Sequence, residues 1–365
     1  MRSLWMVAIA MCCGVAQAQW EMQASGTKAS LRGIDALGDG VVWASGTEGT
    51  VLRTVDGGEH WQRCTVPGGA EALDFRGVQA FDATTALVMA SGTGELSRLY
   101  KTTDGCATWT QVFANPDKDG FFDEMQFLDR STGVLLGDPV QGHFVLFKTT
   151  DGGAHWLRQK GDGLAADPKR QGAFAASNES LMLHRSGKTV SAAFVTGGTA
   201  GAMLYRCRET KPGKLACSNT ALRLGTPAES AGAFAAAQHA GGAVVVGGDY
   251  KEPEGTDAAL FFDGVRWNPA LREPHGYRSA VAYDAVQQVW ITVGPNGTDL
   301  SLDEGRTWKA LRPGPQDGSE EDTGWNALSL PFVVGSKGKI GVLRSTAVTE
   351  AKQQSAAEEN GPGAQ

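Results

Sequence analysis

An eight-residue pattern, Ser/Thr-x-Asp-x-Gly-x-x-Trp, recurs along the chain and constrains its fold more than any other feature. Copies span Thr54–Trp61, Thr102–Trp109, Thr149–Trp156 and Ser301–Trp308, with Cys106 at the glycine position of the second. The aspartate is suited to accept hydrogen bonds from N–H groups of its own turn, and the glycine permits a positive φ. The tryptophan adds a large apolar surface at the start of the next strand. Each copy therefore predicts a turn locked between two strands.

The spacing of these turns indicates a structural repeat. Asp104 follows Asp56 by 48 residues, Asp151 follows Asp104 by 47, and Asp303 follows Asp151 by 152, about three further steps. We interpret Phe261–Trp267 as a shortened copy and Leu204–Cys207 as a decayed one. Repeats of this length with short strands and glycine turns are typical of β-propeller blades. We expect five aspartates to lock turns rather than bind ligands: Asp56, Asp104, Asp151, Asp263 and Asp303.

Each repeat also begins with similar strands, and there are seven of them. The predicted first strands start at Leu31–Ile34, Phe75–Val78, Phe122–Met125, Phe174–Ser177, Phe234–Ala237, Tyr277–Ala280 and Trp325–Leu328. An apolar second strand follows each: Val41–Gly46, Ala86–Gly92, Gly133–Gly137, Ser191–Gly197, Ala243–Gly247, Val289–Gly294 and Phe332–Gly335. The predicted fold class is an all-β, seven-bladed β-propeller over residues 19–345.

The two ends of the chain predict how the ring closes. No turn pattern follows Ile340–Leu343, so the seventh unit lacks its own fourth strand. Trp20–Gln23 resembles the strands that follow the turns elsewhere, and we expect it to become the outer strand of the last blade, which removes an open edge. The polar residues 346–365 are predicted to form a disordered tail.

The N-terminal segment and the cysteines indicate export. Residues 1–18 have a basic start, an apolar run and a small-x-small end, which is the pattern of a cleaved signal peptide. The remaining cysteines are even in number, as in disulfide-bonded exported proteins. Cys207 and Cys217 flank a short polar hairpin, and by elimination Cys64 pairs with Cys106. A periplasmic or secreted protein is expected.

Charge and motif content narrow the function classes. The formal net charge of −7 argues against a general nucleic-acid binder, and the apolar N-terminal run is too short to span a membrane comfortably. Gly197–Gly201 is glycine-rich but falls between strands with no following helix, and the six histidines show no ligand spacing. We therefore expect no cofactor, no bound metal, no membrane span and a monomer.

Together, the turn patterns and strands resemble a known family. The repeated turns resemble those of BNR/Asp-box propellers. Leu31-Arg-Gly-Ile34 and Phe75-Arg-Gly-Val78, with Val51–Gly58, are similar to the photosystem II assembly/stability factor-like branch of that group. The resemblance implies a non-catalytic binding or assembly module. In that branch an arginine-rich patch is thought to engage a partner polypeptide, and Arg32, Arg76 and Arg278 could match it.

The candidate site is the start of the first strands, which ring the channel of a propeller. One position per blade gives Arg32, Arg76, Asp123, Ala175, Ala235, Arg278 and Asn326. Neighbouring positions add Glu124, Asp138, Asp249, Tyr250 and Asn296. Guanidinium groups suit carboxylates and phosphates, so this arc predicts a site for an acidic peptide or a small anionic ligand. The competing interpretation is that the arginines pair with these acidic residues and neutralise the channel.

The alternative function is a sialidase-like glycoside hydrolase, because sialidases also carry such turns. It requires three arginines on a substrate carboxylate, a tyrosine nucleophile and an acid/base aspartate. Arg32, Arg76 and Arg278 with Tyr250 or Tyr277 and Asp138 supply those residue types. The count of seven blades rather than six, and the absence of an Arg-Ile-Pro start, favour a binding module.

Overall fold

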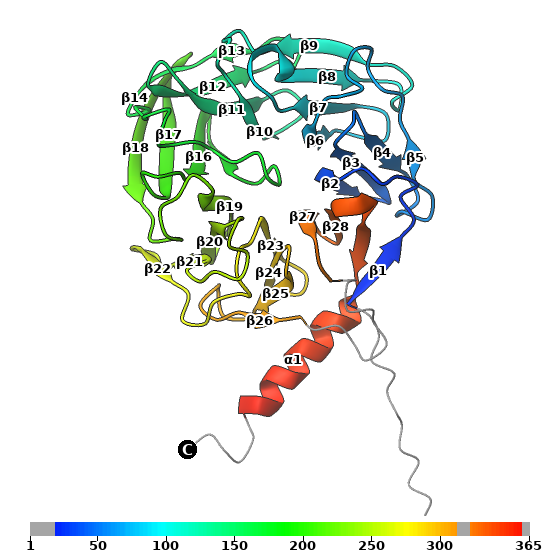
Figure 1. The fold of residues 1–365 in the computed structure, drawn as a ribbon, viewed down its shortest axis with the longest axis vertical. Coiled ribbons are helices and arrows are strands. Elements are labelled where there is room, and N and C mark those ends of the chain that lie inside the picture. Colours follow the sequence, from blue (N-terminus) through cyan, green and yellow to red (C-terminus); the bar gives the residue numbers. More distant parts are fainter. Residues whose placement is uncertain (1–18, 312–321, 360–365) are drawn as a thin grey trace, which may run out of the picture.

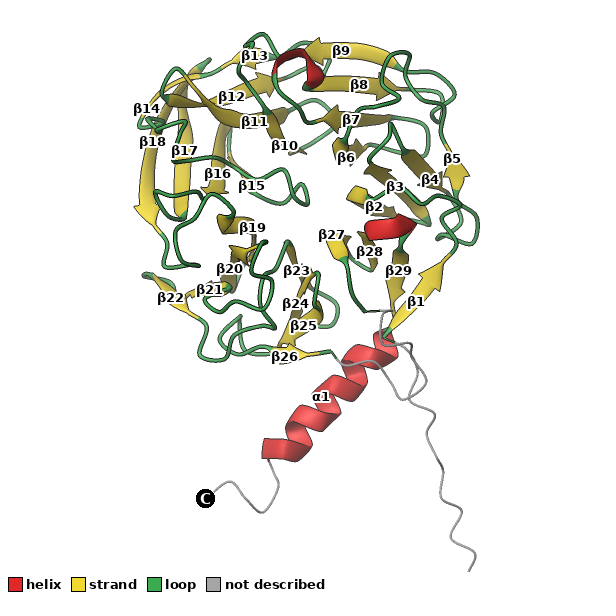
Figure 2. Ribbon diagram, viewed as in Figure 1, coloured by secondary structure: helices red, strands yellow, loops and turns green. Residues whose placement is uncertain are grey.

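Seven small antiparallel sheets form a ring, viewed down its axis in Figure 1. This computed structural model describes residues 19–311 and 322–359. The predicted signal peptide lies outside the described residues. The molecule is a seven-bladed β-propeller, as the sequence predicted, and Figure 2 shows that strands and loops make up nearly all of it.

The blades follow one another along the chain, and each runs from an inner to an outer strand. Blade 1 holds β2 (Leu31–Gly38), β3 (Val41–Gly46), β4 (Val51–Thr54) and β5 (Gln62–Arg63). Blade 2 holds β6 (Phe75–Ala80), β7 (Ala86–Ala90), β8 (Arg98–Thr102) and β9 (Thr110–Ala114). Blade 3 holds β10 (Phe122–Phe127), β11 (Gly133–Val140), β12 (His143–Thr149) and β13 (Leu157–Arg158).

The second half of the ring is less regular. Blade 4 holds β15 (Leu181–Ser186), β16 (Thr189–Thr196), β17 (Met203–Lys211), β18 (Lys214–Ala221) and, outermost, β14 (Lys160–Asp162). Blade 5 holds β19 (Ala231–His239), β20 (Gly242–Asp249), β21 (Ala259–Phe262) and β22 (Trp267–Pro269). Blade 6 holds β23 (Ala280–Asp284), β24 (Val289–Gly294), β25 (Gly297–Ser301) and β26 (Lys309–Ala310). Blade 7 holds β27 (Trp325–Ser329), β28 (Phe332–Gly335), β29 (Ile340–Leu343) and β1 (Trp20–Gln23).

Strand β1 closes the ring as predicted. It pairs antiparallel with β29, with Trp20 opposite Leu343 and Gln23 opposite Ile340. The Trp20 side chain is buried, and its Nε1–H lies 3.0 Å from Thr298 Oγ1 of blade 6. The first strand of the described chain thus joins the last blade and also packs against the blade before it.

Tryptophans beside the outer strands fill spaces between neighbouring blades. Trp61 of blade 1 meets Phe332 of blade 7 edge-on, with ring centroids 6.4 Å apart. Trp156 of blade 3 stacks on Phe113 of blade 2 at 6.3 Å. Trp109 of blade 2 donates from Nε1 to the Thr65 carbonyl next to blade 1 at 3.0 Å. These tryptophans each pack against the preceding blade, where burial of a large ring stabilises the interface.

The predicted turn locks have the expected hydrogen bonds. Asp56 Oδ1 accepts from the His60 N–H at 3.0 Å and from the Thr54 hydroxyl at 2.7 Å, while that hydroxyl accepts from the Gly58 N–H at 3.0 Å. The bond from the His60 N–H, followed by that from Thr54, holds the pKa of Asp56 well below its usual range. The same pattern recurs at Asp104, Asp151 and Asp303, and a shorter version at Asp263.

Both predicted disulfides form. Cys64 is bonded to Cys106 and Cys207 to Cys217. The second bridge joins directly opposed residues of β17 and β18, so it ties the hairpin that lacks an aspartate turn. No helix among the described residues has the length and apolar character needed to cross a membrane.

The structure differs from the sequence prediction at the C-terminus. Residues predicted as a disordered tail form helix α1 (Ser345–Glu359), which extends from the ring in Figure 1. Val348 is fully buried, and Ala347 and Ala351 pack beside it against blades 6 and 7. Lys309 Nζ also donates to Ser355 Oγ at 3.1 Å. These three apolar residues lie within about one turn near the start of the helix, so a mostly polar composition concealed a short docking face.

Candidate functional site

The ring centre is not an open channel, because a loop of blade 4 enters it. Residues 163–180 connect β14 to β15, and Figure 1 shows this segment reaching into the ring. Asn178 Oδ1 accepts from the Met125 N–H of blade 3 at 3.2 Å. Glu179 accepts from the Val281 N–H of blade 6 at 2.7 Å and from the Ala236 N–H of blade 5 at 2.9 Å. We call residues 172–180 the plug, since they tie several blades together from inside.

The plug corrects the predicted first strand of blade 4. Phe174–Ser177 is not a strand, and β15 begins only at Leu181. Ala175 therefore does not take the position in the ring that the sequence assigned to it. Its carbonyl instead accepts from Arg76 Nη1 at 2.8 Å. The apolar start at Phe174 mimicked a strand, but its role is to fill the ring centre.

A β-bulge at the start of the inner strand selects which residue of a blade faces the mouth of the ring. The pairing skips one residue between Leu31 and Gly33, between Phe75 and Gly77, and at three other blades. A bulge leaves the extra residue unpaired and redirects its side chain. The five skipped residues are Arg32, Arg76, Asp123, Phe234 and Asn326. The sequence prediction thus found four of them, and in blade 5 it named Ala235, one residue too late.

Arg32 and Arg76 are neighbours at this mouth, and they differ in how they are paired. Arg76 Nε donates to Asp74 Oδ2 at 2.8 Å. Arg32 Nε is buried and has no hydrogen-bond partner among the described residues. Burial, followed by the charge of Arg76, lowers the pKa of Arg32. The mouth therefore carries a guanidinium group whose hydrogen-bonding capacity is not used within the described protein.

An aromatic group lies beside the two arginines, and the sequence identified only part of it. Phe234 meets Tyr277 edge-on with centroids 4.8 Å apart and Tyr250 at 6.2 Å. Tyr277 is nearly buried, and burial raises its pKa while the charge of Arg32 opposes the shift. Tyr250 is 49% exposed. We call Arg32, Arg76, Phe234, Tyr250 and Tyr277 the mouth cluster.

Arg278, predicted as the third arginine of the arc, is buried inside blade 6. Its side chain is fully buried, its Nε donates to Asp299 Oδ2 at 3.0 Å, and its Nη2 also reaches that oxygen. Nη1 donates to the Tyr277 carbonyl at 3.0 Å. A salt bridge with both partners buried is a structural element, so the predicted arc of three arginines does not form.

The register of the bulge explains this difference. A Cβ placed on Gly46 would lie 2.4 Å from the Ser30 carbonyl, and one on Gly294 would lie 2.4 Å from the Tyr277 carbonyl. Tyr277 thus corresponds to Ser30, and Arg278 corresponds to the buried Leu31 rather than to Arg32. Leu31-Arg32 and Tyr277-Arg278 look alike in sequence, but their positions in the blade differ by one residue.

Acidic residues of the predicted site lie next to the plug. Burial, and then the nearby Asp138, raises the pKa of Asp123, which is 1% exposed. Burial raises the pKa of Asp138 to about 6, and Asp138 Oδ1 accepts from the Ala173 N–H at 2.9 Å. Burial raises the pKa of Glu124 to about 8, and its Oε2 accepts from the Ser180 hydroxyl at 2.5 Å. Asp138 and Glu124 are thus hydrogen-bonded to the plug, and Asp123 and Glu124 are buried.

The remaining predicted residues have local structural contacts. Asn296 Nδ2 donates to the Pro253 carbonyl at 2.6 Å and Asn326 Nδ2 to the Leu31 carbonyl at 2.7 Å. Asp249 accepts from the Lys251 N–H at 2.9 Å. Each of these groups is at least partly used in holding a loop or strand end. Arg32 Nε, Asp123 Oδ2 and Glu124 Oε1 are buried without a partner among the described residues, and of these three side chains only Arg32 is a cation.

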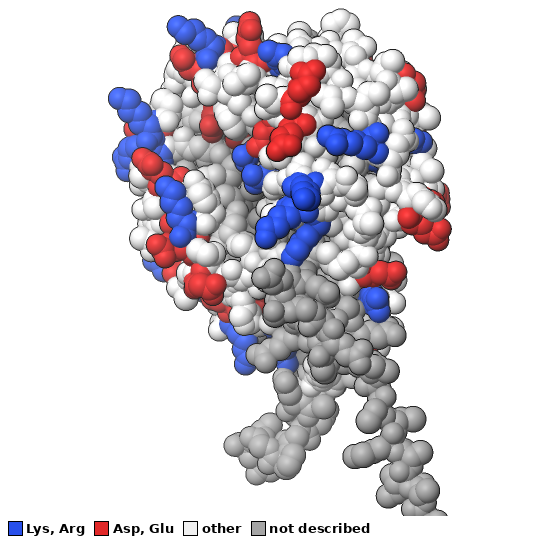
Figure 3. Space-filling view, turned by 45° about the vertical axis from the view of Figure 1, so that its right-hand side comes forward, with Lys and Arg blue, Asp and Glu red and all other residues white. Residues whose placement is uncertain are grey.

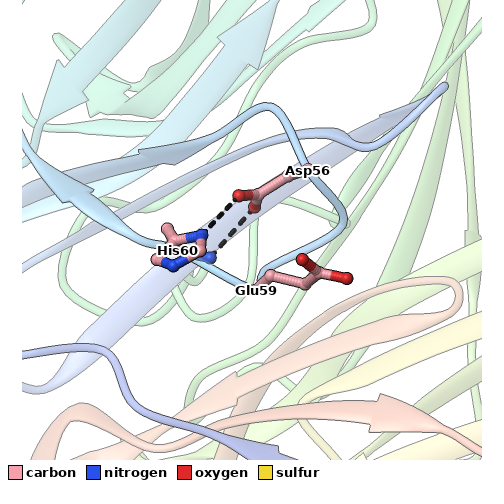
Figure 4. Close-up of side chains that lie close together, drawn as sticks. All are labelled: Asp56, Glu59 and His60. Atoms are coloured by element: carbon pink, nitrogen blue, oxygen red, sulfur yellow. Dashed lines mark hydrogen bonds and ion pairs between the residues drawn. The ribbon is translucent and has the colours of Figure 1, made fainter.

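A cluster that resembles a metal site belongs to the first turn lock. Asp56, Glu59 and His60 bring potential ligand atoms within 4.8 Å of one another (Figure 4). His60 Nδ1 is already 2.8 Å from Asp56 Oδ2, and the same pairing recurs between His155 and Asp151, where alanine replaces the glutamate. The cluster is exposed and its geometry follows from the turn.

Elsewhere, Figure 3 shows acidic and basic side chains interspersed over the face it draws.

Comparisons with known proteins establish the fold alone. No family model matches the chain, and no curated protein matches it. A structure of YCF48 bound to D1 peptide is 17% identical with a TM-score of 0.59, covering 90% of this chain and all of that one. YCF48 from Cyanidioschyzon merolae is 18% identical with a TM-score of 0.58, with the same coverage. An ancestral GH74 enzyme is 13% identical with a TM-score of 0.56, covering 91% of this chain and 47% of that one. None of these matches tests the interpretation of the turns as BNR/Asp-box repeats.

Proposed function

We propose that this protein is a non-catalytic, exported binding module whose mouth cluster engages an acidic peptide segment of a partner protein. The observation that carries the proposal is the Arg32 guanidinium, whose buried Nε has no partner among the described residues. A buried donor without an acceptor is costly. A carboxylate from outside would satisfy it and gain a charge-assisted hydrogen bond.

The local charges favour an anion at this position. Arg76 is paired with Asp74, whereas Arg32 has no carboxylate of its own within hydrogen-bond distance among the described residues. Asp123, the nearest acidic bulge residue, has a raised pKa and is thereby disposed to hold a proton. The two arginines therefore outweigh the ionised carboxylates around them, and the low-dielectric wall of the ring strengthens their field.

The aromatic residues favour a peptide over a small inorganic anion. Tyr250 is half exposed and contacts the buried Phe234, which in turn packs on Tyr277, the tyrosine that lies near Arg32. Tyrosine and arginine together are enriched where proteins bind one another. Among the similar folds, YCF48 was captured with a D1 peptide. The two disulfides support an oxidising compartment such as the periplasm.

The test measures binding of a peptide mixture at the mouth. Arrayed peptides that carry acidic residues next to apolar ones, each with a matched copy in which glutamine and asparagine replace the acids, are incubated with the protein. The strongest binders are then titrated by fluorescence anisotropy against wild type, Arg32→Ala and Tyr250→Ala. Arg63→Ala is the control, because Arg63 is exposed on the outer strand of blade 1.

The expected result is a preference for the acidic copies and a loss of at least about tenfold in affinity for Arg32→Ala, with thermal stability retained. Arg63→Ala should bind as wild type does. If Arg32→Ala instead lowers the melting temperature strongly and leaves binding intact, the arginine has a structural role and the proposal fails.

The glycoside hydrolase alternative has weaker support. The similar fold of an ancestral GH74 enzyme and the Asp123–Asp138 pair favour it. However, Arg278 is buried against Asp299, so the three-arginine clamp is missing, and Asp123 is buried. Release of dye from aryl glycosides, absent in an Asp138→Asn variant, would reverse this assessment.

A further inference from the structure

A groove of about 900 Å³ lies between blades 4 and 5, and no residue of the mouth cluster lines it. Its wall on blade 4 is formed by residues of four strands, β15 to β18, and its wall on blade 5 by the end of β19 and Ala240. Its lining includes Met182, His184, Ala193, Arg206, Arg208 and Ser218. The volume is in the range of ligand-binding sites in proteins.

The groove exists because the outer strands of the two blades differ in length. Strand β17 has nine residues, whereas β21, at the same level of blade 5, has four. Leu204 is buried in a cluster with Leu260 and Trp267 of blade 5. Side chains alternate along a strand, so Arg206 and Arg208 lie on the same face as Leu204, and both are exposed. This face of β17 is covered by blade 5 at Leu204 and is exposed from Arg206 onward.

The open face is positively charged and has no counter-charge of its own. No aspartate or glutamate lines the groove. Among the described residues, no ion pair or side-chain hydrogen bond engages Arg206 or Arg208. Neighbouring acids are used elsewhere: Glu209 is paired with Lys148 at 2.7 Å and Glu304 with His239 at 2.7 Å. Ala193 and Ser218 are small, which leaves the guanidinium groups accessible.

We propose that this blade 4–5 groove binds an acidic peptide in an extended conformation. Arg206 and Arg208 are two residues apart on one strand, so their Cα atoms are about 7 Å apart. Acidic residues two apart on an extended peptide have the same spacing, so two carboxylates match two guanidinium groups. Exposed His184 lies at the β15 side of the groove and adds a third basic group when protonated.

The outer edge of β18 supports an extended ligand. Its pairing with β14 stops at Ala216, and no other strand of the described chain joins this edge. Ser218–Ala221 are all exposed. An exposed strand edge offers backbone donors and acceptors to an added strand. Because Ser218 also lines the groove, the charged face and the free edge meet at one residue.

The experiment uses the full-length protein and a fluorescein-labelled decapeptide of alternating glutamate and serine. One reference peptide has glutamine for glutamate, and a second carries glutamate at every third position. Anisotropy is titrated with wild type, Arg206→Ala/Arg208→Ala and the control Arg63→Ala. Arg32→Ala is measured in parallel, so that binding at the mouth cluster and in the groove are distinguished.

The expected result is a loss of at least about tenfold in affinity for the Arg206→Ala/Arg208→Ala variant. Arg32→Ala should retain groove binding, and the every-third peptide should bind more weakly than the alternating one. A charge-reversed variant, Arg206→Glu/Arg208→Glu, should bind a lysine-serine decapeptide instead.

Two results would overturn the inference. One is equal affinity of the double variant and wild type, which would place the peptide elsewhere. The other is full displacement of the peptide by an oligonucleotide or inorganic polyphosphate at equal charge concentration, which would identify a general polyanion site. If the groove does not bind the peptide, the proposal for the mouth cluster is unaffected, because binding at the mouth is tested separately with Arg32→Ala.

Discussion

Truncation of Trp20 to alanine should destabilise the whole ring, because this side chain closes it. Trp20 is 2% exposed, lies 5.7 Å from Trp325 between ring centroids, and belongs to the apolar cluster that joins blades 6 and 7. Removing a buried tryptophan ring from a core costs about 3–5 kcal/mol in the free energy of unfolding. The indole N–H also donates to Thr298 Oγ1 and, at 3.1 Å, to Asp322 Oδ1.

The hydrogen bonds contribute less than the ring. Asp322 Oδ1 keeps two other donors, the Thr298 hydroxyl at 2.7 Å and Trp325 Nε1–H at 2.8 Å, when the indole is removed. Trp20→Phe should therefore cost only about 1 kcal/mol from the lost N–H, plus any imperfect packing. The difference between the two variants isolates the apolar contribution.

The size of the protein sets the expected shift in melting temperature. An unfolding entropy of about 2.1 cal/mol/K per residue over about 340 residues gives ~0.7 kcal/mol/K. A loss of about 4 kcal/mol therefore lowers the melting temperature by roughly 6 °C. Differential scanning calorimetry measures this without relying on tryptophan fluorescence.

Trp109→Ala is the matched control. Its indole is only half-buried and joins blades 1 and 2, far from the ring closure. It should cost less than Trp20→Ala. A shift below about 2 °C for Trp20→Ala, or a larger one for Trp109→Ala, would refute the view that β1 holds the ring shut.

Three further predictions follow from named contacts. Removing the 64–106 disulfide, with a sequence separation of 42, should lower the free energy of unfolding by about 4 kcal/mol, and removing the 207–217 disulfide, with a separation of 10, by about 3 kcal/mol. Chemical denaturation of the two variants, each with both cysteines of one bridge replaced by serine, measures these losses. The reverse order would contradict loop-closure entropy as the cause. Asp299→Asn should cost about 3–5 kcal/mol because it leaves the buried Arg278 without its counter-charge, whereas an unchanged urea midpoint would mean that Arg278 finds another partner. The pKa of Glu124 is raised by burial to about 8, so the folded state holds this proton more tightly than the unfolded state, and stability should fall as the pH rises from about 4.5 to 8. Glu124→Gln should make that part of a urea-midpoint profile less steep, although other buried carboxyl groups such as Asp138 keep some slope, and an unchanged slope would count against the assignment.

Local chemistry made several parts of the structure predictable. Each turn lock is completed within eight residues, from Thr54 to Trp61 in the first copy, so its hydrogen bonds can be read from the sequence pattern. Cys207 and Cys217 flank a short hairpin, which left little choice of partner. The resemblance of Trp20–Gln23 to the other outer strands was sufficient to predict the ring closure.

The candidate site was less predictable because it depends on register and on long-range packing. Arg32 and Arg278 each follow a large residue near the start of an inner strand, yet only Arg32 lies at the bulge. Phe234 and Tyr277 meet only because blades 5 and 6 are adjacent in the ring. The plug was mistaken for a strand, since Phe174 looks like a strand start when its partner Phe234, 3.9 Å away, is not known.

The sequence by itself determined the number of blades, the turns between strands, the 207–217 bridge and the closure, because each of these depends on residues that are close in the chain or on repetition of one unit. The 64–106 bridge then followed by elimination. Only the tertiary structure decided which arginines reach the surface, which carboxyl groups are buried, and that α1 docks on the ring. A one-residue shift in strand pairing exchanges a core position for an exposed one. Burial then sets the charge state of whatever residue the pairing places there.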